Sequence, residues 1–249
     1  MRNWLLVTLS LIAIFSLPFS VQASTWHYDF NVNDDLSAFT TVNHTGAPSS
    51  SLTTHPGNLN IHTPGGTAYD LCTWVNTNAF RTYRLVDNGA FSLETKMSQS
   101  ASAGNVISGL YLYSDDGNLS NDWVFGANPD YLKLDRGNGV STGLLTAPWT
   151  HIGNYTDLYF QVNYDGSGGY DFNYKLSDIG PWIDYATLSN SALTHVGLIT
   201  KTWSNKPMVD ASFDYLYYNY TPSTVPEPAT FILLGSGLAG LAFYRRKKK

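Results

Sequence analysis

The sequence is poor in cysteine, because Cys72 is the only one among 249 residues. A single thiol excludes an internal disulfide, so the fold depends for its stability on its core or on bound ions. Cys72 lies within Tyr69–Val75, a segment whose composition predicts a strand. This context favours a small buried side chain over a nucleophile, which would need a neighbouring base that the sequence does not identify.

Helical periodicity and glutamate are also scarce between residues 24 and 224. This part of the chain contains 17 Asp but a single Glu, Glu94. Asp favours turns and loops, whereas Glu favours helices. Asn, Gly, Ser, Thr and Tyr are abundant, which is typical of many short strands joined by polar turns. The composition therefore predicts an all-β domain without long helices.

Positive charge is scarce in the same part of the chain. Residues 24–224 hold 8 Lys and Arg against 18 Asp and Glu, a net charge near −10. Such a surface excludes nucleic acid as an expected partner and fits cations or neutral, hydroxyl-rich partners better. No P-loop, His-x-x-x-His pair or dinucleotide fingerprint in a strand–helix context is present, although a zinc pair of His55 and His62 stays open.

The end of the chain has three consecutive features: Pro226-Glu227-Pro228, the uncharged segment Ala229–Tyr244, and five cations that begin with Arg245 and Arg246. The prolines favour an extended backbone. A helix over the apolar segment would be about 24 Å long, shorter than the roughly 30 Å hydrocarbon core of a bilayer. Bilayer thinning and snorkelling cations could close this gap. We expect a single transmembrane helix with its basic tail in the cytoplasm, rather than a buried core helix with a solvated tail.

The start of the chain has the features of a secretory signal peptide. Arg2 precedes the apolar run Trp4–Phe19, and small residues lead up to Ala23. We expect cleavage after Ala23, so this segment takes no part in the mature fold. Export followed by a stop-transfer segment would place Ser24–Thr224 outside the inner membrane.

The Pro-Glu-Pro motif, the short glycine-containing apolar segment and the terminal Arg/Lys cluster resemble the PEP-CTERM sorting signal of Gram-negative bacteria. The resemblance covers about the last 25 residues. It implies recognition by an exosortase-type membrane protease and cleavage near Pro226–Pro228. It also implies a transient stay in the inner membrane, with the body in the periplasm, and then delivery to the cell surface or a secreted, exopolysaccharide-rich biofilm matrix.

Alternating patterns predict strands between these two ends. Phe91, Leu93, Thr95 and Met97 alternate with polar residues, and similar runs occur at 110–113, 159–164 and 170–176. A period of two with one apolar face indicates half-buried antiparallel strands. Asp165–Gly169 joins two of these runs and predicts a hairpin loop. Closely spaced strands with turn residues between them predict a β-sandwich.

The segment from Trp149 to Tyr218 resembles the second half of concanavalin A-like lectin and glucanase jelly rolls, in their laminin-G-like branch. The resemblance rests on the turn Ser177–Trp182 and the late strand Phe213-Asp214-Tyr215. It implies two stacked antiparallel sheets, with the late strand beside an early strand at Trp26–Phe30. The expected domains are a signal peptide (1–23), a β-sandwich (24–220), a linker (221–228), and a transmembrane helix with a basic tail (229–249).

Catalytic motifs of that fold are missing from the sequence. Its retaining glucanases carry a Glu-x-Asp-x-x-Glu strand, whereas this domain has Glu94 alone. Glycoside hydrolysis needs two carboxylates at about 5–5.5 Å or 6.5–9.5 Å. The 17 Asp residues could supply such a pair, but the sequence singles none out. We therefore expect a protein that is not an enzyme and has no catalytic residues.

Two candidate binding sites are suggested by local composition. Calcium is suggested as a cofactor by the hard oxygen ligands of a single loop: Asp115, Asp116, Asn118 and Asp122. The alternative is a solvated acidic turn. Aromatic faces stack on sugars while Asp and Asn bind hydroxyl groups, so aromatic residues in polar loop-like contexts suggest a carbohydrate-binding rim. These are Trp123, Tyr131 and Trp203, although core packing explains most aromatic residues of such a domain.

The sequence favours an exported, non-catalytic protein that binds or decorates exopolysaccharide. Two alternatives stay open. One is a glycan-active enzyme that uses an Asp pair, and the other is a purely structural surface or biofilm component without a ligand. The expected partners are an exosortase-type protease and a polysaccharide.

Overall fold

A computed structural model of the chain describes residues 25–42, 48–71, 78–87, 89–102, 104–115, 121–136, 149–153, 155–189, 193–204, 207–221 and 236. One compact unit spans Ser24–Thr221, and a second comprises 1–23 together with 222–249. The predicted signal peptide lies outside the described residues, as does the predicted transmembrane helix apart from Ser236. Within the described ranges, no helix has the length and apolar character needed to cross a membrane.

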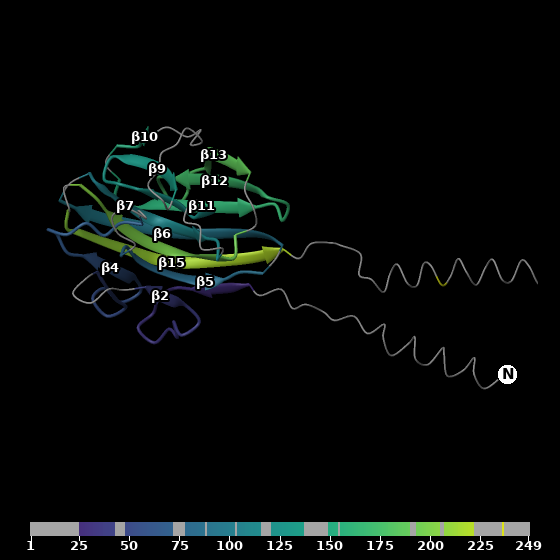
Figure 1. Cartoon of the computed structure of the whole chain (residues 1–249), viewed down its shortest axis with the longest axis horizontal. Coiled ribbons are helices and arrows are strands. Elements are labelled where there is room, and N and C mark those ends of the chain that lie inside the picture. The colour runs from purple at the N-terminus through teal and green to yellow at the C-terminus, as the bar shows by residue number, and fades with distance from the viewer. Residues whose placement is uncertain are drawn as a thin grey trace, which may run out of the picture. The chain divides into compact units, whose positions relative to one another are not determined.

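The unit Ser24–Thr221 consists of antiparallel strands in two sheets, and the all-β prediction is confirmed. Sheet A has the order β13 (Ile183–Ser189), β12 (Gly169–Lys175), β11 (Leu158–Tyr164), β6 (Ala90–Ala101), β15 (Val209–Thr221), β4 (Leu59–Thr63), β3 (Ser49–Ser51). Sheet B has the order β10 (Thr150–His151), β9 (Tyr131–Arg136), β8 (Trp123–Ala127), β7 (Val106–Tyr113), β14 (His195–Thr202), β5 (Phe80–Leu85), β2 (Thr40–Val42). Figure 1 shows β11, β12 and β13 side by side next to the long strands β6 and β15.

The main core lies between the two sheets. Phe125 of sheet B contacts Phe160 and Phe172 of sheet A, with ring centroids 5.1 and 5.3 Å apart and planes inclined by 76°. These edge-to-face contacts join residues that are fully or almost fully buried. The two sheets therefore form a sandwich whose inner faces meet through these three phenylalanine rings.

The early strand β1 (Trp26–Tyr28) pairs with β15, as the sequence predicts. Trp26 is opposite Tyr218, and the two rings stack with centroids 5.0 Å apart. The predicted hairpin between β11 and β12 is also confirmed. Its loop is held by the Asp165 carboxylate, which accepts hydrogen bonds from the backbone N–H groups of Ser167 and Gly169.

The predicted alternation holds in β6 and β11, but half-burial is wrong for β7. In β6 the side chains of Phe91, Leu93, Thr95 and Met97 are buried, as expected. In β7 both faces are buried, and Tyr111 is completely inaccessible. The reason is a second apolar cluster on the outer face of sheet B, which includes Leu71 and Ala79 from the segment before β5. Residues that cover a sheet face from a distant segment cannot be inferred from the strand's own period.

Candidate functional site

The outer face of sheet A carries two neighbouring rows of polar side chains, which we call the polar tract. The first row crosses β13, β12, β11, β6, β15 and β1 through directly paired residues: Asp184, Asn173, Gln161, Glu94, Tyr217, His27. The second row runs beside it: Thr187, Asp171, Asn163, Ser92, Asn219. Six strands about 4.8 Å apart make a tract roughly 24 Å long. Every member can donate or accept hydrogen bonds.

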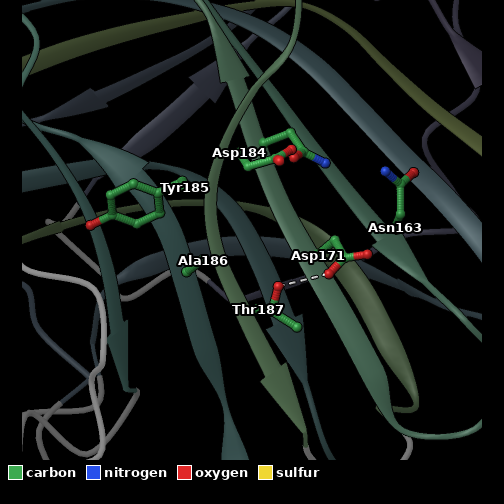
Figure 2. Close-up of a pocket in the computed structure, with 7 residues that line it drawn as sticks. Asn163, Asp171, Asp184, Tyr185, Ala186 and Thr187 are labelled. Carbon is green, nitrogen blue, oxygen red and sulfur yellow. Dashed lines mark hydrogen bonds between the residues drawn. The ribbon is translucent and has the colours of Figure 1, made fainter.

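A hollow of about 490 Å³ lies at the β13 end of the tract. It is lined by Asn163, Asp171, Asn173, Asp184, Tyr185, Ala186 and Thr187. Figure 2 shows Asn163, Asp171 and Asp184 on neighbouring strands, with the ring of Tyr185 directed away from them. That ring stacks on Phe125 in the core, with centroids 5.5 Å apart.

A register shift between Phe172 and Asn173 explains why the face is hollowed here. Asn173 is opposite Asp184, while Phe172 is opposite Ala186, so Tyr185 is the extra residue of a β-bulge. Asp184 and Thr187 are therefore separated by two residues rather than one. Bulges commonly re-aim side chains near functional sites.

Asn173 is the most unusual residue of the hollow. The residue as a whole is only 6% exposed, and its amide forms no hydrogen bond with any residue that the structure describes. The amide atoms are not among the fully buried unpaired polar atoms, so they reach the solvent of the hollow. Its neighbours are more engaged, because Thr187 donates to the Asp171 carboxylate over 2.9 Å and Asn163 donates to Gln161 over 3.0 Å. An amide that reaches a hollow without a protein partner can donate to and accept from the hydroxyl groups of a ligand.

Stacked aromatic rings lie at the other end of the tract. The rings of Tyr215 and Tyr217 are 4.3 Å apart at 24°, and His27 lies 4.6 Å from Tyr217. Tyr215 donates to Glu94 over 2.6 Å, and Tyr217 donates to Asp29. The hydrogen bond to Asp29, together with burial, raises the pKa of Tyr217 to about 12. Burial and Glu94 raise the pKa of Tyr215 as well. Both phenols therefore remain protonated at physiological pH, with their protons directed to Glu94 and Asp29.

A row of cations and aromatic rings flanks the tract. Lys175 lies over the rings of Tyr159 and Trp182, at 4.7 and 4.9 Å from their centroids. Lys96 is 3.1 Å from Asp214 and 3.7 Å from Asp157. Both lysines are thus engaged by rings, carboxylates or carbonyl groups beside the tract rather than within it.

The predicted rim of Trp123, Tyr131 and Trp203 is only partly brought together. Trp123 is 4% exposed and belongs to the main core, so its placement at the surface is wrong. Its position in β8 directs it inward, which loop-like flanking residues had obscured. Tyr131 lies on the outer face of sheet B, 6.1 Å from the exposed ring of Trp149. Lys133 bridges Trp149 and Trp203, with its ammonium 4.4 and 5.4 Å from their ring centroids.

The predicted calcium ligands are described only in part, since Asp116 and Asn118 lie outside the described residues. Asp122 is fully buried and accepts hydrogen bonds from the Tyr111 hydroxyl and the Ser114 N–H. Asp115 accepts one from Tyr113. Among the residues that the structure describes, no group of three or more His, Cys, Asp or Glu side chains could hold a metal. Asp122 acts here as a hydrogen-bond acceptor of the fold, and calcium binding stays a prediction.

The predicted sorting residues Pro226, Glu227, Pro228, Arg245 and Arg246 lie outside the described residues. Cys72 does too, and so does Gly139–Gly143, whose Gly-x-Ser-x-Gly spacing is that of a nucleophile elbow.

Comparison with protein families finds one match, in which residues 224–248 correspond to the PEP-CTERM protein-sorting motif. This supports the predicted sorting signal, which implies export and processing by an exosortase-type membrane protease. A comparison of the sequence with curated proteins gives no match.

Three solved structures illustrate the similarity of the fold. The GH43 BlXynB protein from Bacillus licheniformis has a TM-score of 0.60 at 16% identity, covering 82% of this chain and 40% of its own. The xylan beta-1,4-xylosidase from Bacillus halodurans C-125 has a TM-score of 0.58 at 16% identity, covering 82% and 41%. The CBM2 module of the evolved Dit of Lactobacillus casei BL23 phage J-1 has a TM-score of 0.51 at 10% identity, covering 78% and 94%. This chain thus spans about two fifths of the length of both Bacillus proteins, and the similarity concerns the fold alone.

Sequence reasoning missed the polar tract. In β6, β11 and β12 the sequence does show the polar positions, because they alternate with the apolar ones. Their alignment into rows depends on the pairing of strands that are distant in sequence. Glu94 of β6, for example, lies between Gln161 of β11 and Tyr217 of β15.

Proposed function

We propose that this chain is an exported cell-surface or matrix protein that binds polysaccharide through the polar tract without catalysing a reaction. The observation that carries the proposal is the hollow lined by Asn173, a largely buried residue whose amide reaches the hollow without a described hydrogen-bond partner. The PEP-CTERM motif supports export and sorting. We also propose that the β-sandwich is of the concanavalin A-like type.

The chemistry of the tract suits a hydroxyl-rich chain. Amides offer donors and acceptors together, carboxylates accept, and the hydroxyl oxygens of Tyr215 and Tyr217, whose protons are directed to Glu94 and Asp29, also accept. The stacked Tyr215 and Tyr217 rings add apolar faces next to these groups. An extended tract that crosses six strands offers several contacts to a linear polymer, whereas a deep, apolar pocket would suit a small ligand better.

Replacing Asn173 with Leu tests the proposal. The variant keeps the size of the side chain but removes its hydrogen bonds, so we expect roughly three- to tenfold weaker binding. Affinity electrophoresis in gels that contain β-glucan, xylan or partially deacetylated chitin measures the effect, and circular dichroism checks the fold. Trp149→Ala, on the exposed aromatic patch of sheet B, is the matched control and should bind normally.

The reverse result would contradict the tract as the binding site. If Trp149→Ala loses binding while Asn173→Leu retains it, the binding surface is the patch of Tyr131, Trp149 and Trp203 on sheet B. If no polysaccharide retards the wild-type protein, and it self-associates without added glycan, the purely structural alternative is favoured.

One observation supports the alternative that the protein is a glycan-active enzyme with an Asp pair. Asp171 and Asp184 face the same hollow from neighbouring strands, in diagonal positions. Diagonal positions on adjacent strands are about 7–8 Å apart, which is compatible with the spacing of an inverting glycosidase. Release of reducing ends from xylan or β-glucan, abolished in Asp171→Asn or Asp184→Asn, would establish this activity.

The sorting signal gives a separate expected result. The intact mass of the protein from its native host should correspond to a C-terminus near Val225–Pro228. The same measurement in a strain without the sorting protease should show the full tail. If Arg245–Lys249 persists in the parent strain, the segment is a permanent anchor and the matrix location is wrong.

A further inference from the structure

The carboxylates of the polar tract lack cationic partners. Glu94, Asp171 and Asp184 form no salt bridge with a residue that the structure describes. Two of them accept hydrogen bonds from neutral hydroxyl groups instead, Glu94 from Tyr215 and Asp171 from Thr187. The tract therefore bears negative charge that the protein itself does not neutralise.

The nearest cations do not compensate this charge. Lys96 is paired with Asp157 and Asp214, and Lys175 donates to the Asp178 carbonyl while lying over two aromatic rings. Potentials at an interface are usually complementary, and like charges brought together are costly. A polymer of uronic acids would therefore be repelled, whereas a cationic polymer would be attracted.

The hollow adds an observation that is independent of charge. An ammonium group has three donors and no acceptor. The hollow presents the carboxylates of Asp171 and Asp184 as acceptors. Beside them lies Asn173, a residue more than nine-tenths buried whose amide has no described hydrogen-bond partner and reaches the hollow. A divalent cation is the less suitable occupant, because no set of three acidic or histidine side chains gathers among the described residues.

We infer that the polar tract selects a polysaccharide with free amino groups, such as a partially de-N-acetylated amino-sugar polymer. This inference rests on the proposed function and narrows its ligand. The carboxylates of Asp171, Asp184 and Glu94 pair with the ammonium groups, and the amides and tyrosine hydroxyls bind the sugar hydroxyls. Preference for amino over N-acetyl groups is then an electrostatic property of this face.

The test compares two forms of one polymer with the full-length protein. Soluble chitin oligosaccharides that are fully N-acetylated, and the same oligosaccharides after de-N-acetylation, are titrated by calorimetry at pH 6 in 50 mM and 500 mM salt. We expect tighter binding of the de-N-acetylated form, with the difference reduced at high salt because of screening. The isosteric double variant Asp171→Asn/Asp184→Asn should lose roughly two- to fivefold in affinity for the de-N-acetylated form for each carboxylate and keep only the smaller preference that Glu94 supports.

Matched variants separate failure of the inference from failure of the function. Asp130→Asn removes one exposed carboxylate near sheet B and should bind like the wild type. If this variant weakens binding as much as a tract variant does, net charge alone explains the preference and the inference is overturned. Equal affinity for both polymers, with Asn173→Leu still impaired, would overturn the inference and leave the function standing. Binding of neither polymer, nor of any neutral glycan, would overturn both. Binding of polygalacturonate only in the presence of calcium would identify a metal as the occupant instead.

Discussion

Replacing Lys201 with Met should lower the free energy of unfolding by about 3–5 kcal/mol, the usual cost of removing one partner of a buried ion pair. Lys201 is 2% exposed, and its ammonium lies 2.6 Å from Asp135 and 3.5 Å from Asp70. Lys133 is 3.4 Å from Asp135 and completes a group of two cations and two anions. Chemical denaturation of wild type and variant measures the loss.

The pKa shifts of this group show how tightly the charges are coupled. Burial alone would lower the pKa of Lys201, but Asp135 and Asp70 outweigh it and raise that pKa. Burial would raise the pKa of Asp135, but Lys201 and Lys133 lower it. Lys133 behaves differently, because burial lowers its pKa by more than the neighbouring Asp135 carboxylate raises it. Loss of Lys201 would therefore leave Asp135 with one weaker partner.

Two glycines lie in the sheet beneath this group, at positions where a side chain would clash with the neighbouring backbone. Gly109 and Gly126 are paired between the row of Lys201 and the row of Asp135 on the outer face of sheet B. A Cβ atom on Gly126 would lie 2.3 Å from the Ser108 carbonyl oxygen.

A double variant supplies the control for the Lys201 prediction. Lys201→Met with Asp135→Leu removes one charge of each sign and leaves Lys133 and Asp70 as a balanced pair. It should recover most of the stability lost in Lys201→Met. A double variant that is as unstable as the sum of the two single variants would show that the charges are not coupled.

The second large effect is expected at alkaline pH, where the protein should unfold between about pH 10 and 12. Burial raises the pKa of Tyr111, Tyr170 and Tyr218 far above the ordinary value of 10. Burial also raises the pKa of Tyr113 and of Tyr185 to about 12. In the unfolded chain these phenols ionise near pH 10.

The direction of the effect follows from proton binding. Above pH 10 the folded state keeps protons that the unfolded state has lost, so stability is complete below pH 10 and falls as the pH rises. Each fully buried tyrosine contributes a slope of about 1.4 kcal/mol per pH unit once its unfolded form is ionised. Three such residues give about 4 kcal/mol per pH unit, which is large against a total stability of 5–15 kcal/mol.

Urea unfolding at pH 8, 10, 11 and 12 measures this loss, together with tyrosinate absorbance. We expect absorbance and unfolding to rise together. Tyr218→Phe removes one of the ionising groups and should make the slope shallower by about 1.4 kcal/mol per pH unit. Full ionisation of the tyrosines at pH 11 in a protein that remains folded would contradict the prediction.

Part of the fold could be predicted because strand alternation is local. The buried positions of β6 and β11 follow directly from a period of two, as does the hairpin at Asp165–Gly169. Burial of both faces in β7 could not be predicted, because the apolar residues that cover Tyr111 come from the distant segment that contains Leu71 and Ala79. The prediction that Trp123 lies at the surface was wrong for a different reason. Its polar neighbours in the sequence suggest a loop, whereas Trp123 is the first residue of the buried strand β8.

The sequence by itself determined the sorting signal. This signal consists of an extended motif, an apolar segment and a basic tail, and it is defined by their order along the chain. It also determined the all-β class, the net negative charge and the absence of a disulfide. Only the tertiary structure decided which polar residues meet. Glu94, Gln161, Asn173 and Asp184 come from four strands, and the register of long-range pairs aligns them in one row. Alternation fixes the face on which a side chain lies, but strand order and one β-bulge decide its neighbours, and the candidate site is a property of those neighbours.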